Sequence, residues 1–91
     1  MNQLVKYTVF SSPTCHYCHA LMDWLSQHGV AFEEKDIMAD MNARRVMVEK
    51  SQQMHVPVSL IELQNPAGQK MERVVVGFDQ LQIAKILNIR V

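Results

Sequence analysis

The sequence predicts a small α/β domain in which short strands and helices alternate along the chain. Three observations carry this prediction: apolar runs of strand length recur, segments with helical periodicity follow the first two, and a turn segment joins the last two. The predicted order is β-α-β-α-β-β-α, which gives a four-stranded mixed sheet with helices on both faces. The chain has 91 residues, a length that fits one domain over residues 1–91.

The first half of the chain predicts two strands and the helix between them. An apolar strand covers residues 4–10, and a helix covers residues 16–28 and stops at Gly29. The second strand, residues 31–37, is acidic enough to suit the edge of a sheet. A strand–helix–strand unit implies a parallel pair with a right-handed crossover. The expected inner face of the helix consists of Leu21, Met22 and Leu25.

The second half predicts another helix, a hairpin and a last helix. Asp40 can cap a helix that runs to about Met54, and Asp79 can cap the last one. Strands over residues 58–63 and 70–76 flank a turn segment rich in Asn, Pro and Gly, which makes them a hairpin. We expect the first and third strands to be parallel, like the first and second. The apolar residues expected on these helices are Ala43, Val46 and Met47, then Leu81, Ile83, Ala84, Ile86 and Leu87.

The composition of the chain argues against two classes of function, nucleic-acid binding and membrane insertion. Nine Lys and Arg balance nine Asp and Glu, and no basic block appears, so nucleic-acid binding is not expected. The apolar runs are far shorter than the roughly 20 residues of a membrane span, and no signal peptide is recognisable. We therefore expect a cytoplasmic protein, most simply a monomer, that acts neither on membranes nor on nucleic acid. The seven Met residues are expected to help fill the core.

The two cysteines, Cys15 and Cys18, lie two residues apart where the first strand gives way to the first helix. A C-x-x-C at such a junction is typical of a redox site. The helix N-terminus offers unpaired N–H groups and the positive end of a dipole, and both favour the nucleophilic thiolate. Two buried free cysteines are not expected at a junction between a strand and a helix. A structural disulfide is not expected either, since one that closes so short a loop stabilises little.

Four segments, taken together, resemble the glutaredoxins and the glutaredoxin-like NrdH redoxins, which have the shortest form of the thioredoxin fold. They are residues 12–18, 29–34, 55–58 and 76–79. The resemblance implies a thiol–disulfide oxidoreductase in which Cys15 attacks a disulfide and Cys18 resolves the mixed disulfide. It implies no bound cofactor, disulfide-containing proteins as partners, and glutathione or thioredoxin reductase as the electron donor.

The resemblance also implies how substrate is held. Pro57 would be cis, so that the backbone of Val56 faces an extended peptide or glutathione. Gly77, Phe78 and Asp79 would form a third wall of the site, and the helix N-terminus at Asp79 could hold a carboxylate. The remaining residues implied to contact substrate are His16, Tyr17 and His55. Phe78 could equally be part of the core.

Several positions depart from the usual glutaredoxin pattern. His16 replaces the proline between the cysteines, and a protonated imidazole beside Cys15 would stabilise its thiolate and raise the redox potential. Ser12 replaces a lysine that often pairs with glutathione, and His55 replaces a threonine. Gly77 is followed by Phe78, as in the NrdH type, which takes electrons from thioredoxin reductase. These changes weigh against glutathione.

Two other classes remain open from the residues alone. The pattern from Cys15 to His19 matches C-x-x-C-H, the c-type haem attachment motif, although no export signal precedes it. Cys15, Cys18, His19 and His55 could also bind zinc or an iron–sulfur cluster, which would make the chain a metal or cluster carrier on the same fold. If the chain is a dithiol oxidoreductase, as the resemblance implies, we expect no metal in the site.

Overall fold

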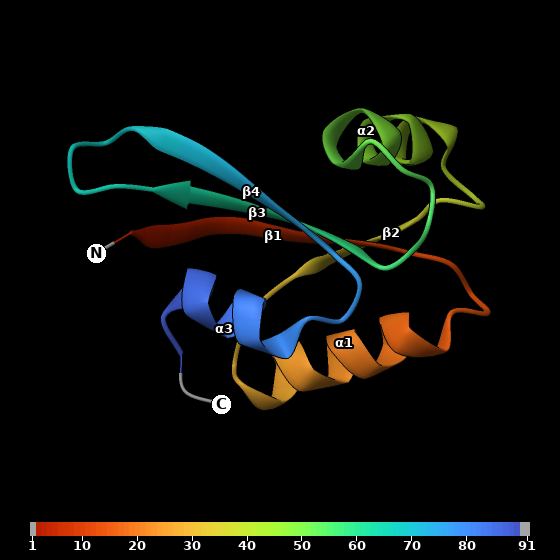
Figure 1. Cartoon of the computed structure of the whole chain (residues 1–91), viewed down its shortest axis with the longest axis horizontal. Helices are drawn as coiled ribbons and strands as arrows, with labels where there is room; N and C mark the ends of the chain where they lie inside the picture. Colours follow the sequence, from red (N-terminus) through yellow and green to blue (C-terminus); the bar gives the residue numbers. More distant parts are fainter. Residues whose placement is uncertain (1, 90–91) are drawn as a thin grey trace.

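We analysed a computed structural model of the chain, which describes residues 2–89. The elements are β1 (Gln3–Ser11), α1 (His16–Gln27), β2 (Glu33–Asp36), α2 (Met41–Ser51), β3 (Val58–Gln64), β4 (Lys70–Val76) and α3 (Gln80–Leu87). The predicted order of elements is confirmed. Figure 1 shows one sheet with α2 on one face and α1 and α3 on the other, as predicted.

The sheet has the strand order β2-β1-β3-β4, so acidic β2 lies at an edge, as expected. β1 and β2 are parallel, and β3 and β4 form the predicted antiparallel hairpin. The expectation that the first and third strands are parallel is wrong, because β1 pairs with β3 antiparallel.

The direction of β3 follows from the course of α2. Strand β2 ends with Asp36 beside Ser11, and β3 begins with Val58 beside Phe10. The chain therefore leaves and re-enters the sheet at the same end of β1. Helix α2 crosses over the sheet instead of returning along the strands (Figure 1), so β3 has to run opposite to β1.

Two apolar clusters lie on opposite faces of the sheet because strand side chains alternate. Tyr7 and Val9 of β1 pack with α1 and α3, whereas Phe10 packs with α2. The buried residues contributed by the three helices are Cys18, Leu21, Trp24 and Leu25 of α1, Ala43 and Met47 of α2, and Ile83 and Ala84 of α3. The larger cluster therefore joins α1, which carries the cysteines, to the centre of the sheet.

Helix α2 is shorter than predicted. It ends at Ser51, because Gln52 takes a left-handed conformation (φ 60°) and donates its N–H to Val48 O, 2.8 Å away. Val46, expected to face inward, is 37% exposed. The helix instead buries Ala43 and Met47 and packs Val48, partly buried, against the same cluster.

Some of the methionines help to fill the core, as expected: Met47 is fully buried, and Met22 and Met71 pack, partly buried, against the larger cluster. Three others are exposed around the two ends of α2: Met38, Met41 and Met54. Leu81, in the first turn of α3, is also exposed. Within residues 2–89, every helix is too short and too polar to cross a lipid bilayer.

Candidate active site

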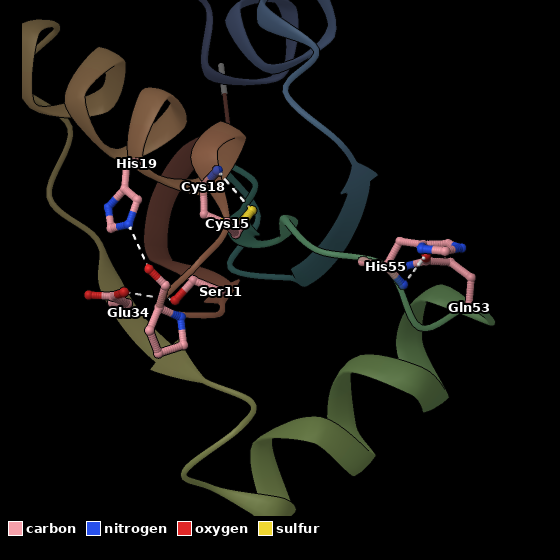
Figure 2. The surroundings of a disulfide bond; sticks show 8 residues. Ser11, Cys15, Cys18, His19, Glu34, Gln53 and His55 are labelled. Atoms are coloured by element: carbon pink, nitrogen blue, oxygen red, sulfur yellow. Dashed lines mark hydrogen bonds between the residues drawn. A yellow bond between two sulfur atoms is a disulfide. The ribbon is translucent and has the colours of Figure 1, made fainter.

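Cys15 is the N-cap of α1, and Cys18 lies in the first turn of that helix. The two form a disulfide. The backbone N–H of Cys18 also donates to Cys15 Sγ over 3.1 Å (Figure 2). Sulfur accepts this bond more strongly as a thiolate, and the helix dipole acts in the same direction. The position therefore favours the ionised form of Cys15 once the disulfide is reduced.

The two sulfurs differ in access. Cys15 is partly exposed, whereas Cys18 is 0% exposed and packs beneath the first turn of α1. An incoming disulfide can therefore reach Cys15 but not Cys18. The asymmetry fits the roles that the resemblance implies, with Cys15 as the attacking thiol and Cys18 as the resolving one.

Local hydrogen bonds hold the loop that carries Cys15. Its N–H donates to Ser12 O over 3.2 Å. Nε2 of His19 lies 3.3 Å from Pro13 O, and because a carbonyl can only accept, this nitrogen has to carry the proton. At the start of the loop, the buried Ser11 hydroxyl donates to Glu34 Oε2 over 2.7 Å (Figure 2).

The sequence did not reveal these supporting roles. From the sequence, His19 stands out only as a candidate metal or haem ligand, Glu34 lies in the strand predicted over residues 31–37, and Ser11 has no predicted role in the site. Serine at a strand end and an acidic residue on an edge strand are common, so neither gave a usable signal. Ser11 and Glu34 become a pair only through the parallel register of β1 and β2.

The Val56–Pro57 peptide bond is cis, as the resemblance implied, and Pro57 is buried. The N–H of Gly77 donates to Pro57 O over 2.8 Å, which links the loop before β3 to the loop after β4. Gly77 has φ +84°, a conformation that residues with a Cβ rarely adopt. The structure thus brings two of the predicted substrate-binding segments into direct contact.

His16 and Tyr17 lie between the cysteines at the start of α1. Both are exposed, and their rings form an edge-to-face pair with centroids 6.4 Å apart. Tyr17 is 68% exposed, so most of its side chain is open to solvent.

Phe78 and Asp79 have structural contacts of their own. Phe78 is half-buried against the core, edge-on to the ring of Trp24 at 6.2 Å. Asp79 caps α3, as predicted, and its Oδ1 accepts the N–H of Gln82 over 3.1 Å. The carboxylate of the protein itself therefore occupies part of the helix terminus where the sequence had suggested an external one.

His55 does not face the cysteines. Its N–H donates to Gln53 Oε1 and its carbonyl accepts from Gln53 Nε2, which fixes a small loop of its own. Figure 2 shows the His55 ring directed away from Cys15 and Cys18, with His19 on the opposite side of the pair. The four side chains considered as metal ligands are therefore not brought together. Across residues 2–89, no group of three His, Cys, Asp or Glu side chains is arranged to hold a metal ion.

Solved structures of known proteins share this architecture. A thioredoxin-like protein, BC3987, is 27% identical and has a TM-score of 0.72, with 90% of this chain and 100% of that one covered. The glutaredoxin of Methanosarcina mazei also has a TM-score of 0.72, at 17% identity, over 97% of this chain and 88% of that one. The second likeness is one of fold alone.

Two curated proteins are similar in sequence. An uncharacterised glutaredoxin-like 8.6 kDa protein from the rubredoxin operon of Clostridium pasteurianum is 28% identical, over 88% of this chain and 95% of its own. The global transcriptional regulator Spx of Streptococcus mutans is 26% identical over 90% of this chain and 58% of its own length. The glutaredoxin family model matches residues 7–62, the part of the chain that holds Cys15, Cys18 and Pro57, and the chain therefore belongs to the glutaredoxin family.

Proposed function

We propose that the protein is a thiol–disulfide oxidoreductase that reduces disulfides in other proteins by dithiol exchange. The observation that carries the proposal is the asymmetry of the pair: Cys15 is reachable at the N-terminus of α1, and Cys18 is buried one turn further on. A family member with this arrangement has both the nucleophile and the group that resolves its product.

The reaction transfers two electrons in two exchange steps. The Cys15 thiolate attacks one sulfur of the substrate disulfide, forms a mixed disulfide and expels the other sulfur as a thiolate, which takes up a proton. Cys18 then loses its proton and attacks Cys15 Sγ. The Cys15–Cys18 disulfide forms, and the second substrate sulfur leaves as a thiol. The substrate is reduced and the protein is left in the disulfide state described above.

The backbone around Pro57 supports a role for the loop before β3 in binding substrate. The contact between Gly77 and Pro57 holds two loops together, and no atom lies within 4 Å of the point where a Cβ on Gly77 would be. We propose that the segment from His55 to Pro57, together with Gly77, receives an extended stretch of the substrate, with Tyr17 as an apolar contact at the rim.

Substitution of each cysteine tests the proposal. With a disulfide-containing protein such as insulin as substrate and dithiothreitol as reductant, Cys15→Ser should lower the rate to that of dithiothreitol alone. Incubated with the substrate in the absence of dithiothreitol, Cys18→Ser should accumulate a mixed disulfide between Cys15 and the substrate, visible by mass spectrometry under non-reducing conditions. Full turnover by the Cys15→Ser protein would overturn the assignment, and so would trapping of the substrate on Cys18 in that variant.

We also propose that a flavoprotein reductase of the thioredoxin reductase class, not glutathione, supplies the electrons. Glutathione carries two carboxylates, yet residues 11–19, 53–58 and 76–79 contain no Lys or Arg to pair with them. The test compares NADPH oxidation with thioredoxin reductase and with glutathione plus glutathione reductase, using the same substrate. A faster rate with glutathione would contradict this part of the proposal.

The dithiol chemistry also bears on the compartment and the oligomeric state in which the protein works. We propose that the protein works as a monomer in the cytoplasm, where thiols are kept reduced. The three segments of the site come from one chain, so catalysis needs no second subunit.

A further inference from the structure

A groove of about 530 Å³ lies between the edge strand β4 and helix α3. Its walls include Leu63 and Val74 from the sheet and Ile86 from the helix. None of the residues that line it belongs to the candidate active site. The groove therefore has to be explained by something other than dithiol exchange.

Two cationic side chains line this groove, Arg73 from β4 and Lys85 from α3. Within residues 2–89, neither forms an ion pair with an acidic side chain. Glu72 also lines the groove, but its carboxylate pairs with Lys50 of α2, 2.8 Å away on the other side of the sheet. The chain as a whole has a formal net charge of zero, so the groove is a local concentration of positive charge.

Strand β4 is also the last strand of the sheet in the described part of the chain. Its inner edge pairs with β3 along its whole length, from Lys70 to Val76. On its outer edge, alternate backbone N–H and C=O groups have no strand beside them. Such an edge is a template for an added strand.

We propose that the groove binds an extended acidic segment of a partner protein, which adds to the sheet alongside β4. Alternate side chains of an added strand point to the same face. Every second side chain would therefore fall on the α3 side, where Arg73 and Lys85 can pair with carboxylates. Gln82, whose side chain also lines the groove, can hydrogen-bond the same groups.

The charges favour such a partner over a second copy of this chain. Arg73 is the middle residue of the seven in β4. Full antiparallel pairing of two β4 strands would place the two Arg73 side chains opposite each other, and like charges in that position are destabilising. An acidic strand turns the same contact into an attraction.

The first experiment uses a capped ten-residue peptide of alternating Glu and Thr, with a fluorescent label, and measures anisotropy against the whole protein. We expect saturable binding that weakens about tenfold between 50 and 500 mM salt, because exposed charge pairs are screened. The double variant Arg73→Glu/Lys85→Glu should lose at least tenfold in affinity. It should in turn bind the matching Lys and Thr peptide, which the native protein does not.

A matched control separates a site from overall charge. Arg44→Glu/Arg45→Glu makes the same change in net charge on α2, away from the groove, and should leave binding within twofold. The milder Arg73→Gln/Lys85→Gln variant, whose fold is checked by circular dichroism, should also weaken binding. If the groove variant and the control variant lost the same affinity for the peptide, the binding would depend only on net charge, and the proposal would be overturned.

Backbone pairing has its own test. An acidic peptide with N-methyl groups on alternate residues keeps its charges but loses the N–H groups that one strand edge needs, so it should bind at least tenfold more weakly. In NMR spectra of the protein titrated with the acidic peptide, the amide chemical shifts that change should belong to residues of β4 and α3. The proposal would be overturned if the chemical shifts changed around Cys15 instead. It would also be overturned if the peptide did not bind, or if the protein formed a concentration-dependent dimer through β4. Cys15→Ser should bind the peptide normally, so this result does not depend on the redox proposal.

Discussion

His16 follows Cys15 directly and is exposed in the first turn of α1. A cationic imidazole there adds to the effect of the helix N-terminus and stabilises the Cys15 thiolate, hence the reduced protein. We predict a redox potential above the thioredoxin value of about −270 mV. One exposed charge contributes about 0.5–1 kcal/mol, so His16→Ala should lower the potential by about 10–20 mV.

The measurement is the redox equilibrium with dithiothreitol or glutathione buffers, followed by alkylation of free thiols. His55→Ala is the matched control, because its ring is directed away from the cysteines (Figure 2) and its loss should leave the potential unchanged. A potential that rises in His16→Ala, or a native value at or below that of thioredoxin, would contradict the role given to His16.

Gly77 allows a second prediction at the scale of one residue. A Cβ at this position would meet no atom within 4 Å, so any cost of Gly77→Ala comes from its φ of +84° alone. We expect a loss of about 1–2 kcal/mol in the free energy of unfolding, measured in urea. Gly77→Asn should cost less although it is larger, because Asn tolerates positive φ better. A larger loss for Asn would indicate crowding instead of backbone conformation.

The sequence predicts best those features that depend on the local chain. The spacing of Cys15 and Cys18, with a strand and a helix on either side, predicts their place at the start of a helix, and the structure puts them there. The caps at Asp40 and Asp79 were found in the same way, and the structure confirms them. The support of Ser11 by Glu34 depends on which strands are neighbours, so it could not be recognised from the sequence.

Among the elements, α2 shows most clearly how local and tertiary information differ. Its start was predictable, because Asp40 accepts the N–H groups of Asn42 and Ala43 at 3.0 and 3.1 Å. Its end was not, because Gln52 adopts the left-handed conformation that glycine usually signals. The direction in which α2 crosses the sheet could not be predicted either, and that direction makes β3 antiparallel to β1.

The cap of α2 gives a prediction at this scale. Asp40→Ala leaves two N–H groups without their acceptor and should lower the free energy of unfolding by about 1 kcal/mol. Asp40→Asn keeps the accepting oxygen and should recover most of that loss. Urea unfolding followed by far-UV circular dichroism measures both. If Asn costs as much as Ala, the negative charge matters more than the hydrogen bonds.

For the whole molecule, the sequence predicted the order of the elements, a mixed sheet and the two covered faces, but not the direction of β3 relative to β1. Periodicity identifies strands and helices, whereas strand direction depends on where each connection re-enters the sheet. The contact between Tyr7 and Ser59 is of the same long-range kind. The Tyr7 hydroxyl donates to Ser59 Oγ over 2.7 Å, between residues 52 apart in sequence, in the larger core. This contact joins β1 to β3 at the centre of the sheet.

Tyr7 therefore predicts how the stability of the whole domain depends on alkaline pH. Burial raises the pKa of Tyr7 from 10.0 to about 12, and the hydrogen bond to Ser59 offsets only part of that effect. The folded state holds the proton more tightly than the unfolded state. The corresponding stability is present in full below pH 10 and is lost as the pH rises through about 12.

Between pH 9 and 11.5 this group alone should remove about 2 kcal/mol from the free energy of unfolding. Tyr7→Phe has no proton to lose at this position. At pH 8 the variant should be about 1 kcal/mol less stable than the native protein, because Ser59 loses its partner. Its stability should then fall less steeply above pH 10, so that the two unfolding curves converge or cross. Urea unfolding of both oxidised proteins across this range measures the difference, in which titration of the other groups cancels. Parallel pH profiles would mean that Tyr7 ionises as readily in the folded state as in the unfolded chain, and that the core around Ser59 is open to water.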